Sequence, residues 1–269
     1  NFKYIFYTGL VIGAIALSRQ WGFLLFLPLI FLFFSKELNI KYLKLWSLSA
    51  FFGAAFSSWF YINLFLRYGT FTPFNLDRRG FSFSNQKLNF YIPNSEHFQY
   101  LFTKPIRPHL DNQFISILYS DLWGDYWGYF TFTSRFLDIG RNQLAIGDYF
   151  ARINIISAFT SIVIVALCIK TFRKYKSRFI VQYLKLAIIC SFIGYLIFAI
   201  AYPDATSDTV KATYIIQLFH LMVFTASIYL NYLEKINRKI YISIISFLVI
   251  AYIHNFQSYL SHFPINFYP

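Results

Sequence analysis

Long apolar runs alternate with short polar segments along most of the chain. Seven runs are candidates to cross a bilayer, at about Phe2–Leu17, Trp21–Phe34, Leu45–Leu66, Ile153–Ile169, Phe179–Ala201, Ala212–Leu233 and Ile240–Phe256. A membrane-spanning helix needs about 20 apolar residues, with a range of about 17–25. The first two runs are short and only residues 18–20 separate them, so we expect them to be tilted or half-buried together. The pattern predicts an all-α, polytopic membrane protein with about seven transmembrane helices.

Basic residues orient these predicted helices. Lys3 and the short segments 35–44, 170–178 and 234–239 together hold 12 of the 24 Lys and Arg residues. Short loops rich in Lys and Arg stay on the cytoplasmic side of the membrane, and the predicted helices between them alternate in direction without conflict. We therefore expect three parts in a protein of the cytoplasmic membrane: transmembrane helices in 1–66, a large extracytoplasmic loop in 67–152, and further transmembrane helices in 153–269.

The composition supports a membrane protein. The chain is 57% hydrophobic and only 13% charged, whereas soluble domains average about 25% charged residues. A disordered chain is excluded by this composition, and 2 Cys and 11 Gly residues exclude a disulfide-stapled or collagen-like fold. The net charge of +13 follows from the basic cytoplasmic segments, so it indicates anionic lipid contact rather than nucleic acid. Because the chain opens with Asn1 and is apolar from Phe2, we expect it to be the C-terminal part of a longer protein.

The predicted loop contains a candidate helix. Asp111 follows two prolines and is a plausible N-cap. After it, Phe114, Ile117, Leu118 and Leu122 follow helical spacing. This spacing predicts a short amphipathic helix that lies at the membrane surface.

Residues 120–130 combine carboxylates and indole rings at close spacing. Asp121 and Asp125 are four residues apart, as are Trp123 and Trp127. On a helix the two carboxylates would share a face, where they would meet a polar ligand while the indoles stack against it. The alternative is an aromatic belt at the membrane interface, with the carboxylates capping backbone amides.

Cations gather near the predicted outer ends of the helices. Arg67 ends the third apolar run, Arg78 and Arg79 follow it, and Lys211 precedes the sixth run. Arginine matches phosphate geometry through a bidentate fork, so these residues are candidates for a lipid phosphate. The alternatives are plain head-group contact, pairing with Asp77, and a snorkelling Lys211.

Other signatures of chemistry are weak. His220 lies within the sixth apolar run, and we expect it to be a hydrogen-bonded core residue. The five histidines show no metal-ligand spacing, and no glycine-rich phosphate loop or nucleophile elbow is present. No cofactor is identified from the sequence, and a divalent metal ion is left open.

Four stretches carry a family resemblance: residues 9–22, 67–75, 123–128 and 211–214. The first is similar to a pair of short helices joined by a basic turn, and the second, with Tyr68-Gly69, to the entry of an outer loop. The third contains Trp-Gly-Asp-Tyr, and the fourth, Lys211 to Tyr214, is similar to a re-entry into the membrane. Together they resemble the C-terminal half of GT-C glycosyltransferases of the protein-mannosyltransferase and aminoarabinose-transferase kind.

The resemblance implies sugar transfer outside the cytoplasmic membrane, from a polyprenyl-phosphate-linked sugar donor to a glycan, lipid or protein acceptor. In that family the catalytic acid lies in a first outer loop, so no catalytic residue is assigned in this chain. By position, the candidates for the lipid phosphate are Arg67, Arg78, Arg79 and Lys211, and those for the sugar or acceptor are Asp121, Trp123, Asp125, Trp127 and Tyr214. The cations would stabilise the departing phosphate.

Three other functions are open. A transporter of lipid or solute would place ionisable residues at mid-span, where the sequence has only Lys185 and His220. A polymerase or ligase of polyprenyl-linked glycans would share the large outer loop and the arginines. A membrane scaffold without catalysis is weakly disfavoured by the clustering of carboxylates, arginines and aromatic rings on one side.

Overall fold

The computed structural model describes residues 2–18, 20–35, 40–71, 80–105, 110, 112–124, 141–203 and 210–260. Every regular element in these ranges is helical. Five helices are long and apolar enough to cross a membrane: α3 (Ile40–Tyr68), α9 (Arg141–Lys174), α10 (Phe179–Ala201), α11 (Ala212–Ile236) and α12 (Arg238–Leu260). The predicted all-α fold is therefore confirmed for the described residues, and these helices are consistent with a membrane protein.

The remaining two apolar runs form shorter elements. They are α1 (Phe2–Ser18), the 3-10 helix η1 (Gln20–Leu25) and α2 (Phe26–Ser35). At about 1.5 Å per residue, the 10 residues of α2 extend over about 15 Å, half the thickness of a hydrocarbon core. The structure accordingly offers five candidate spans among its described residues, where the sequence predicts about seven.

Glycines bring α1 and α3 into close contact. A Cβ atom added to Gly53 would lie 2.5 Å from Cγ2 of Ile12, and one added to Gly13 would lie 2.8 Å from the Gly53 carbonyl. In addition, Ser49 donates a hydrogen bond to the Ile5 carbonyl at 3.2 Å. Small residues that let two backbones approach, with hydroxyls bonded across the interface, are typical of helix packing in membranes.

Large apolar side chains cover the outside of the long helices. Phe51 is 65% exposed, Trp59 61%, Ile162 64% and Ile253 66%. Exposed apolar surface on this scale would be costly in water, whereas lipid tails are as apolar as these side chains. The long helices are thus suited to a lipid environment.

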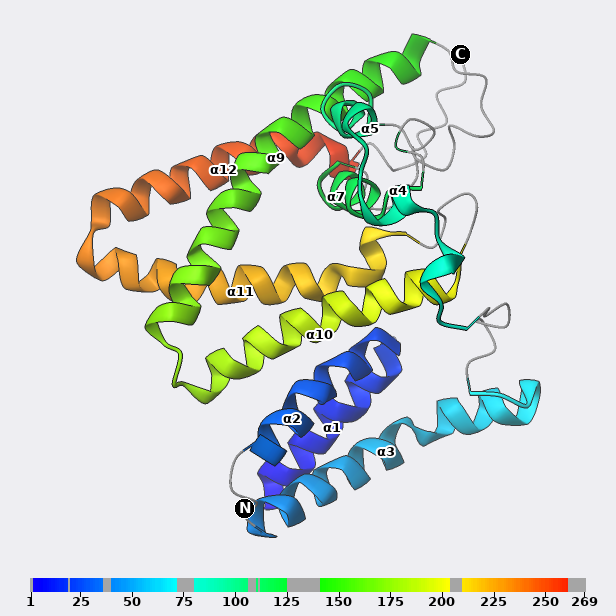
Figure 1. Cartoon of the computed structure of the whole chain (residues 1–269). Coiled ribbons are helices and arrows are strands. Elements are labelled where there is room, and N and C mark those ends of the chain that lie inside the picture. Colours follow the sequence, from blue (N-terminus) through cyan, green and yellow to red (C-terminus); the bar gives the residue numbers. More distant parts are fainter. Residues whose placement is uncertain are drawn as a thin grey trace.

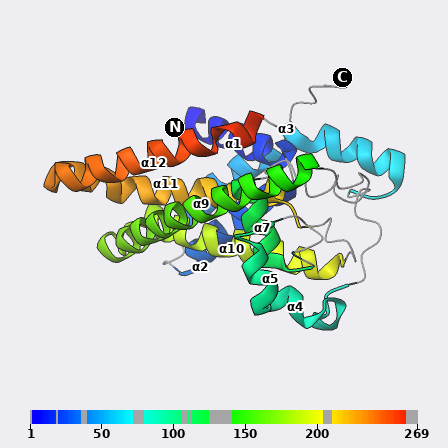
Figure 2. The same ribbon diagram turned by 90° about the horizontal axis from the view of Figure 1, so that it is seen from above.

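The two ends of the bundle differ (Figure 1). At one end lie the connections from α9 to α10 and from α11 to α12, with the basic residues of segments 170–178 and 234–239; we call it the basic end. The opposite end, the loop end, carries the short helices η2 (Phe83–Asn85), α4 (Leu88–Tyr91), α5 (Ser95–Tyr100) and α7 (Phe114–Trp123). These four helices form the loop module, and Figures 1 and 2 both place it beside the long helices.

The structure corrects two expectations about the loop. The helix predicted from Phe114 onward is present as α7, but it is buried on nearly all sides, and its polar Ser116, Ser120 and Asp121 are buried with its apolar residues. It is therefore not an amphipathic helix at a membrane surface. Its N-cap is Gln113 rather than Asp111, which lies outside the described residues.

Candidate functional site

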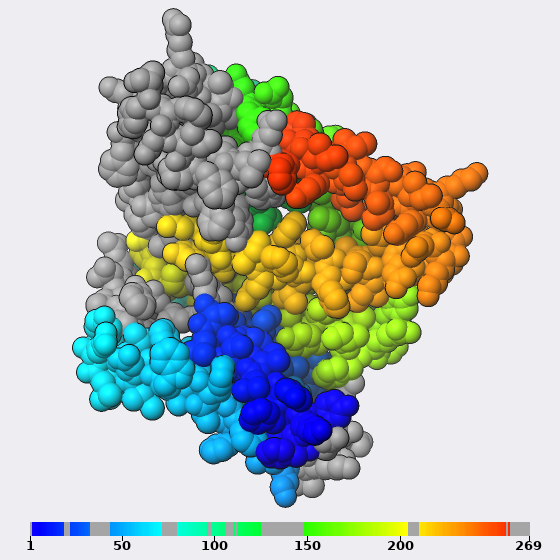
Figure 3. All heavy atoms as spheres, turned by 180° about the vertical axis from the view of Figure 1, so that it is seen from behind, coloured from blue at the N-terminus to red at the C-terminus, as the bar shows by residue number. Residues whose placement is uncertain are grey.

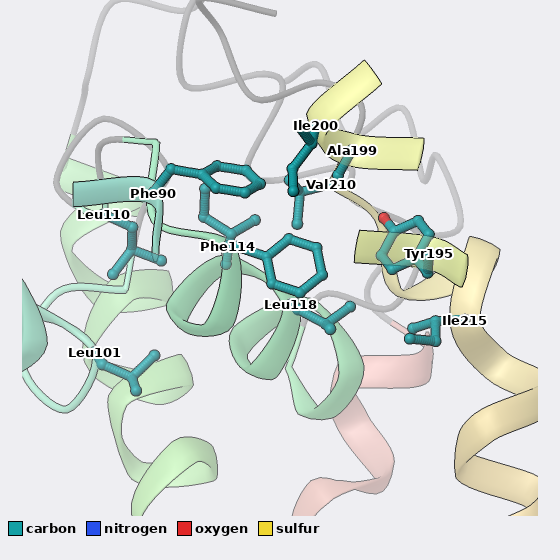
Figure 4. Close-up of a cluster of buried hydrophobic side chains, with 11 residues drawn as sticks. Phe90, Leu101, Leu110, Phe114, Leu118, Tyr195, Ala199, Ile200, Val210 and Ile215 are labelled. Atoms are coloured by element: carbon teal, nitrogen blue, oxygen red, sulfur yellow. The ribbon is translucent and has the colours of Figure 1, made fainter. Parts of the chain in front are cut away.

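A buried aromatic cluster forms the centre of the loop module (Figure 4). The ring centroid of Phe114 lies 5.3 Å from that of Phe90 and 5.6 Å from that of Tyr195. Phe90 comes from α4, Phe114 from α7 and Tyr195 from α10. Since all three side chains are at most 2% exposed, this cluster joins the loop module to the long helices. Aromatic pairs at such separations stabilise a core by about 0.5–1.5 kcal/mol beyond area burial.

Two side chains of the loop module cap the end of α10. Nδ2 of Asn85 donates to the Ile200 carbonyl at 3.1 Å, and Nε2 of Gln86 donates to the Ala199 carbonyl at 2.8 Å. The last carbonyls of a helix have no partner within it, so both bonds satisfy groups that would otherwise need water. Asn112 donates in turn to Oε1 of Gln86 at 2.8 Å. The sequence interpretation missed these residues, and the adjacent amides of Asn85 and Gln86 in a Phe-rich stretch were the available signal.

A second polar contact joins the loop module to α9. The buried Asn154 donates through Nδ2 to the Leu101 carbonyl at 2.9 Å and to Oγ of Ser120 at 3.3 Å. The Tyr119 hydroxyl donates to the carbonyl of Asn154 at 2.7 Å. Burial raises the pKa of the Tyr119 phenol well above its usual value, so this hydroxyl remains a donor. Asn154 is the one amide in the run Ile153–Ile156, a signal that the sequence interpretation did not use.

The structure places the α7 candidates inside the protein. Asp121 is fully buried, and Trp123 is 8% exposed with its ring 5.3 Å from Phe219 of α11 in an edge-on contact. Carboxylates are rarely buried completely unless they are paired. The Trp123 ring is covered by protein, where the prediction had it stacking against a ligand. Asp125 and Trp127 lie outside the described residues.

Lys211 and Tyr214 lie at the turn into α11. The buried Tyr195 of α10 binds the backbone of Lys211 twice: its hydroxyl accepts from the amide at 2.7 Å and donates to the carbonyl at 3.1 Å. Nζ of Lys211 lies 5.9 Å from the ring centroid of Tyr214, whose side chain packs against the aromatic cluster. This geometry fixes the backbone at Lys211 and leaves its side chain half-buried near an aromatic face.

The arginine candidates are not gathered at one place by the described structure. Arg67 is exposed in the last turn of α3, whose main packing partner is α1. Arg78 and Arg79 lie outside the described residues, as does Asp77. Of the predicted site residues, the structure therefore joins Asp121, Trp123, Lys211 and Tyr214 to the loop module and α11.

The expectation for His220 is confirmed for its hydrogen bond and wrong for its place in the core. Its side chain is exposed on α11, and Nδ1 donates to the Ile216 carbonyl of the same helix at 2.9 Å. Seen from behind, α11 forms part of the surface between α1 and α12 (Figure 3). Hydrogen bonding within the helix partly satisfies the imidazole, which lowers the cost of exposing it to an apolar environment.

A metal centre is not supported by the described residues. Within them, no group of three or more His, Cys, Asp or Glu side chains is placed to hold an ion. The two cysteines are free, Cys168 buried and Cys190 half-buried, and both lie within the long helices. What the loop module offers chemically is a rigid set of buried amides, hydroxyls and one carboxylate, with cations nearby.

Comparisons with known proteins identify no similar protein. No family model matches the chain, and neither a curated protein nor a solved structure matches it.

Proposed function

We propose that this chain is the membrane-embedded C-terminal part of a glycosyltransferase. The enzyme would move a sugar from a polyprenyl-phosphate donor to a glycan, lipid or protein acceptor. The loop end would face outward from the cytoplasmic membrane, with the basic end in the cytoplasm. The two shorter elements, α1 and the η1–α2 pair, would add two further passages to the five long helices, giving about seven.

One observation carries this proposal: α7 buries Ser116, Ser120 and Asp121 at the loop end of a membrane protein. Buried polar groups must be hydrogen-bonded, and Ser116 and Ser120 are bonded to Gln113 and Asn154, so they belong to a polar network inside the protein. Asn154 of α9 bonds Ser120, and Gln86 bonds the end of α10, so the loop module is anchored on two long helices, as a preorganised binding site requires.

The proposed chemistry is a displacement at the anomeric carbon of the sugar. The bond from that carbon to the phosphate oxygen breaks, and a bond to the acceptor oxygen forms. Polyprenyl phosphate leaves with the electron pair, and the acceptor proton passes to a base that we do not assign. Lys211 would stabilise the departing phosphate and Tyr214 would bind the sugar or acceptor, while the buried Asp121 would support this site from within α7.

The test is to identify the lipid released by the full-length protein. Membranes containing the protein are supplied with polyprenyl-phosphate pentose, hexose and amino-sugar donors, and lipids are measured by mass spectrometry. We expect free polyprenyl monophosphate from at least one donor, and much less from Asp121→Asn. Release of polyprenyl diphosphate from a diphosphate-linked glycan would favour a polymerase or ligase instead. Movement of an intact donor across the bilayer, with no bond broken, would favour a transporter.

A further inference from the structure

The loop-end seam between α9 and α12 holds a second group of polar side chains. Tyr149 and Arg152 belong to α9, and His254 belongs to α12. The Tyr149 hydroxyl donates to the His254 carbonyl at 3.2 Å, and the two rings lie 6.3 Å apart. The Arg152 guanidinium carbon lies 6.0 Å from the centre of the same tyrosine ring. Arg152 and His254 therefore both lie close to one aromatic ring, from two different helices.

Hydrogen bonds fix the orientation of the His254 ring. Nδ1 of His254 lies 2.9 Å from Oδ1 of Asn255, whose Nδ2 donates to Oγ of Ser157 at 2.9 Å. Because that Asn255 oxygen can only accept, the network assigns the proton to Nδ1 of His254. Asn255 is 3% exposed and Ser157 is fully buried, so this support is rigid. Nε2 of His254 makes no hydrogen bond to any residue that the structure describes.

Arg152 is equally accessible. Its side chain is exposed, and it forms no ion pair within the described ranges. Asp148 lies one turn earlier on α9 and is also exposed, so it is the one described carboxylate close in sequence that competes for Arg152. An exposed i,i+4 pair contributes only about 0.3–0.5 kcal/mol, which a phosphate at the guanidinium would readily exceed.

Exposed apolar side chains lie next to these residues. Ile155 of α9 is 44% exposed, and Ile253 and Phe256 of α12 are 66% and 41% exposed. A ligand at Arg152 and His254 would therefore meet apolar surface beside the polar groups, as it would between acyl chains and head groups.

We propose that Tyr149, Arg152 and His254 form a binding site for the phosphate of a lipid. The guanidinium would bind two phosphate oxygens through its fork, and His254 would contribute a further contact through Nε2. A free phosphate could satisfy the same groups, but the exposed apolar side chains beside them favour a phosphate carried on an apolar chain. The inference concerns binding and stands or falls independently of sugar transfer.

The experiment measures binding of three probes to the full-length protein in an uncharged detergent. Farnesyl phosphate carries chain and phosphate, farnesol carries the chain alone, and inorganic phosphate lacks the chain. We expect saturable binding of farnesyl phosphate, read from tryptophan fluorescence and from a rise in the thermal midpoint. Arg152→Ala should weaken it by about tenfold or more, the loss expected for one charge-assisted hydrogen bond. His254→Phe keeps the ring against Tyr149 and should weaken binding by about two- to tenfold.

Arg173→Ala is the matched control, since Arg173 is an exposed arginine on the same helix at the basic end. It should bind farnesyl phosphate as the wild type does. The proposal is overturned if Arg152→Ala binds like the wild type, or if Arg173→Ala loses as much affinity. Equal affinity for inorganic phosphate would assign the site to a free anion, and equal affinity for farnesol would show that the phosphate is not recognised; either result also refutes a lipid-phosphate site.

Discussion

Replacing Asn154 by Ala tests whether α9 holds the loop module in place. The substitution removes two hydrogen bonds from Nδ2, to the Leu101 carbonyl and to Ser120. Each such bond contributes about 1 kcal/mol, and the buried Leu101 carbonyl loses a donor at a cost of about 1–3 kcal/mol. The buried Oδ1 of Asn154 has no hydrogen-bond partner in the described structure, so its removal offsets about 1 kcal/mol. The net loss is about 2–4 kcal/mol.

This loss should appear as local opening, because the bonds link α9 to the loop module and not to the rest of the bundle. Hydrogen exchange followed by mass spectrometry reads the opening free energy of individual peptides. In the Asn154→Ala protein, amides of α7 and of residues 98–103 should exchange roughly 30- to 700-fold faster, since about 1.4 kcal/mol corresponds to a factor of ten. Amides in the middle of α10 should be unchanged.

Asn63→Ala is the control, since Asn63 is an exposed amide on α3. It should leave exchange in α7 within about twofold of the wild type, as surface substitutions usually do. Exchange in α7 that is equally slow in Asn154→Ala and wild type would refute the assigned role of Asn154. Uniform acceleration across all helices would show that Asn154 supports the whole bundle instead.

Three further predictions follow from the packing, the orientation and the buried phenol. Gly53→Leu should lower the thermal midpoint, because even its Cβ would lie 2.5 Å from an α1 side chain and overpacking costs about 1–3 kcal/mol. The control Ala50→Leu, at an exposed position of the same helix, should leave the midpoint unchanged. In intact cells, a membrane-impermeant thiol reagent should label Ser84→Cys but not Ser177→Cys; the reverse pattern would invert the proposed topology. Burial raises the pKa of Tyr119, so its neutral form stabilises the fold below pH about 10, and this contribution is lost as the pH rises further. Between pH about 9 and about 11, the thermal midpoint should therefore fall less steeply with pH in Tyr119→Phe than in the wild type. Equal slopes in the two proteins would contradict this.

Hydropathy predicted the long helices well, because in a bilayer every backbone group must be bonded within its own segment. The predicted run Phe179–Ala201 matches α10 at both ends, and Ala212 begins α11 as expected. The prediction was less accurate for α9, which begins at Arg141, within the segment interpreted as loop. Helices can continue beyond the apolar run that identifies them, and hydropathy does not report that continuation.

The sequence pattern did not predict which residues of the loop module are buried. Helical spacing located α7, but its period alone gave one apolar face and suggested a surface helix. The structure covers the opposite face with α9 and α11, so Ser120 and Asp121 are buried too. Such contacts depend on which helices, distant in the sequence, pack together. The amphipathic pattern of one helix does not specify which helix packs against its polar face.

The same limit explains the groups that were missed. Asn85 and Gln86 looked like ordinary loop residues, yet they bond the last carbonyls of α10, over a hundred positions along the chain. His254 was missed because its position in the sequence does not match the spacing of metal ligands. The structure sets its ring beside that of Tyr149 of another helix, which Arg152 also approaches. Conversely, His220 looked like a core residue because charge at mid-span is costly, and a bond to its own helix reduces that cost.

The side of the membrane on which the reaction takes place shows whether the loop module carries out sugar transfer. Sealed membrane vesicles of right-side-out and inside-out orientation, each containing the full-length protein and a polyprenyl-phosphate sugar donor, are given a membrane-impermeant acceptor from outside. We expect glycosylated acceptor and free polyprenyl monophosphate in right-side-out vesicles only, because the loop module would face the acceptor there. Product formed only in inside-out vesicles, or in neither orientation with any donor class, would contradict it.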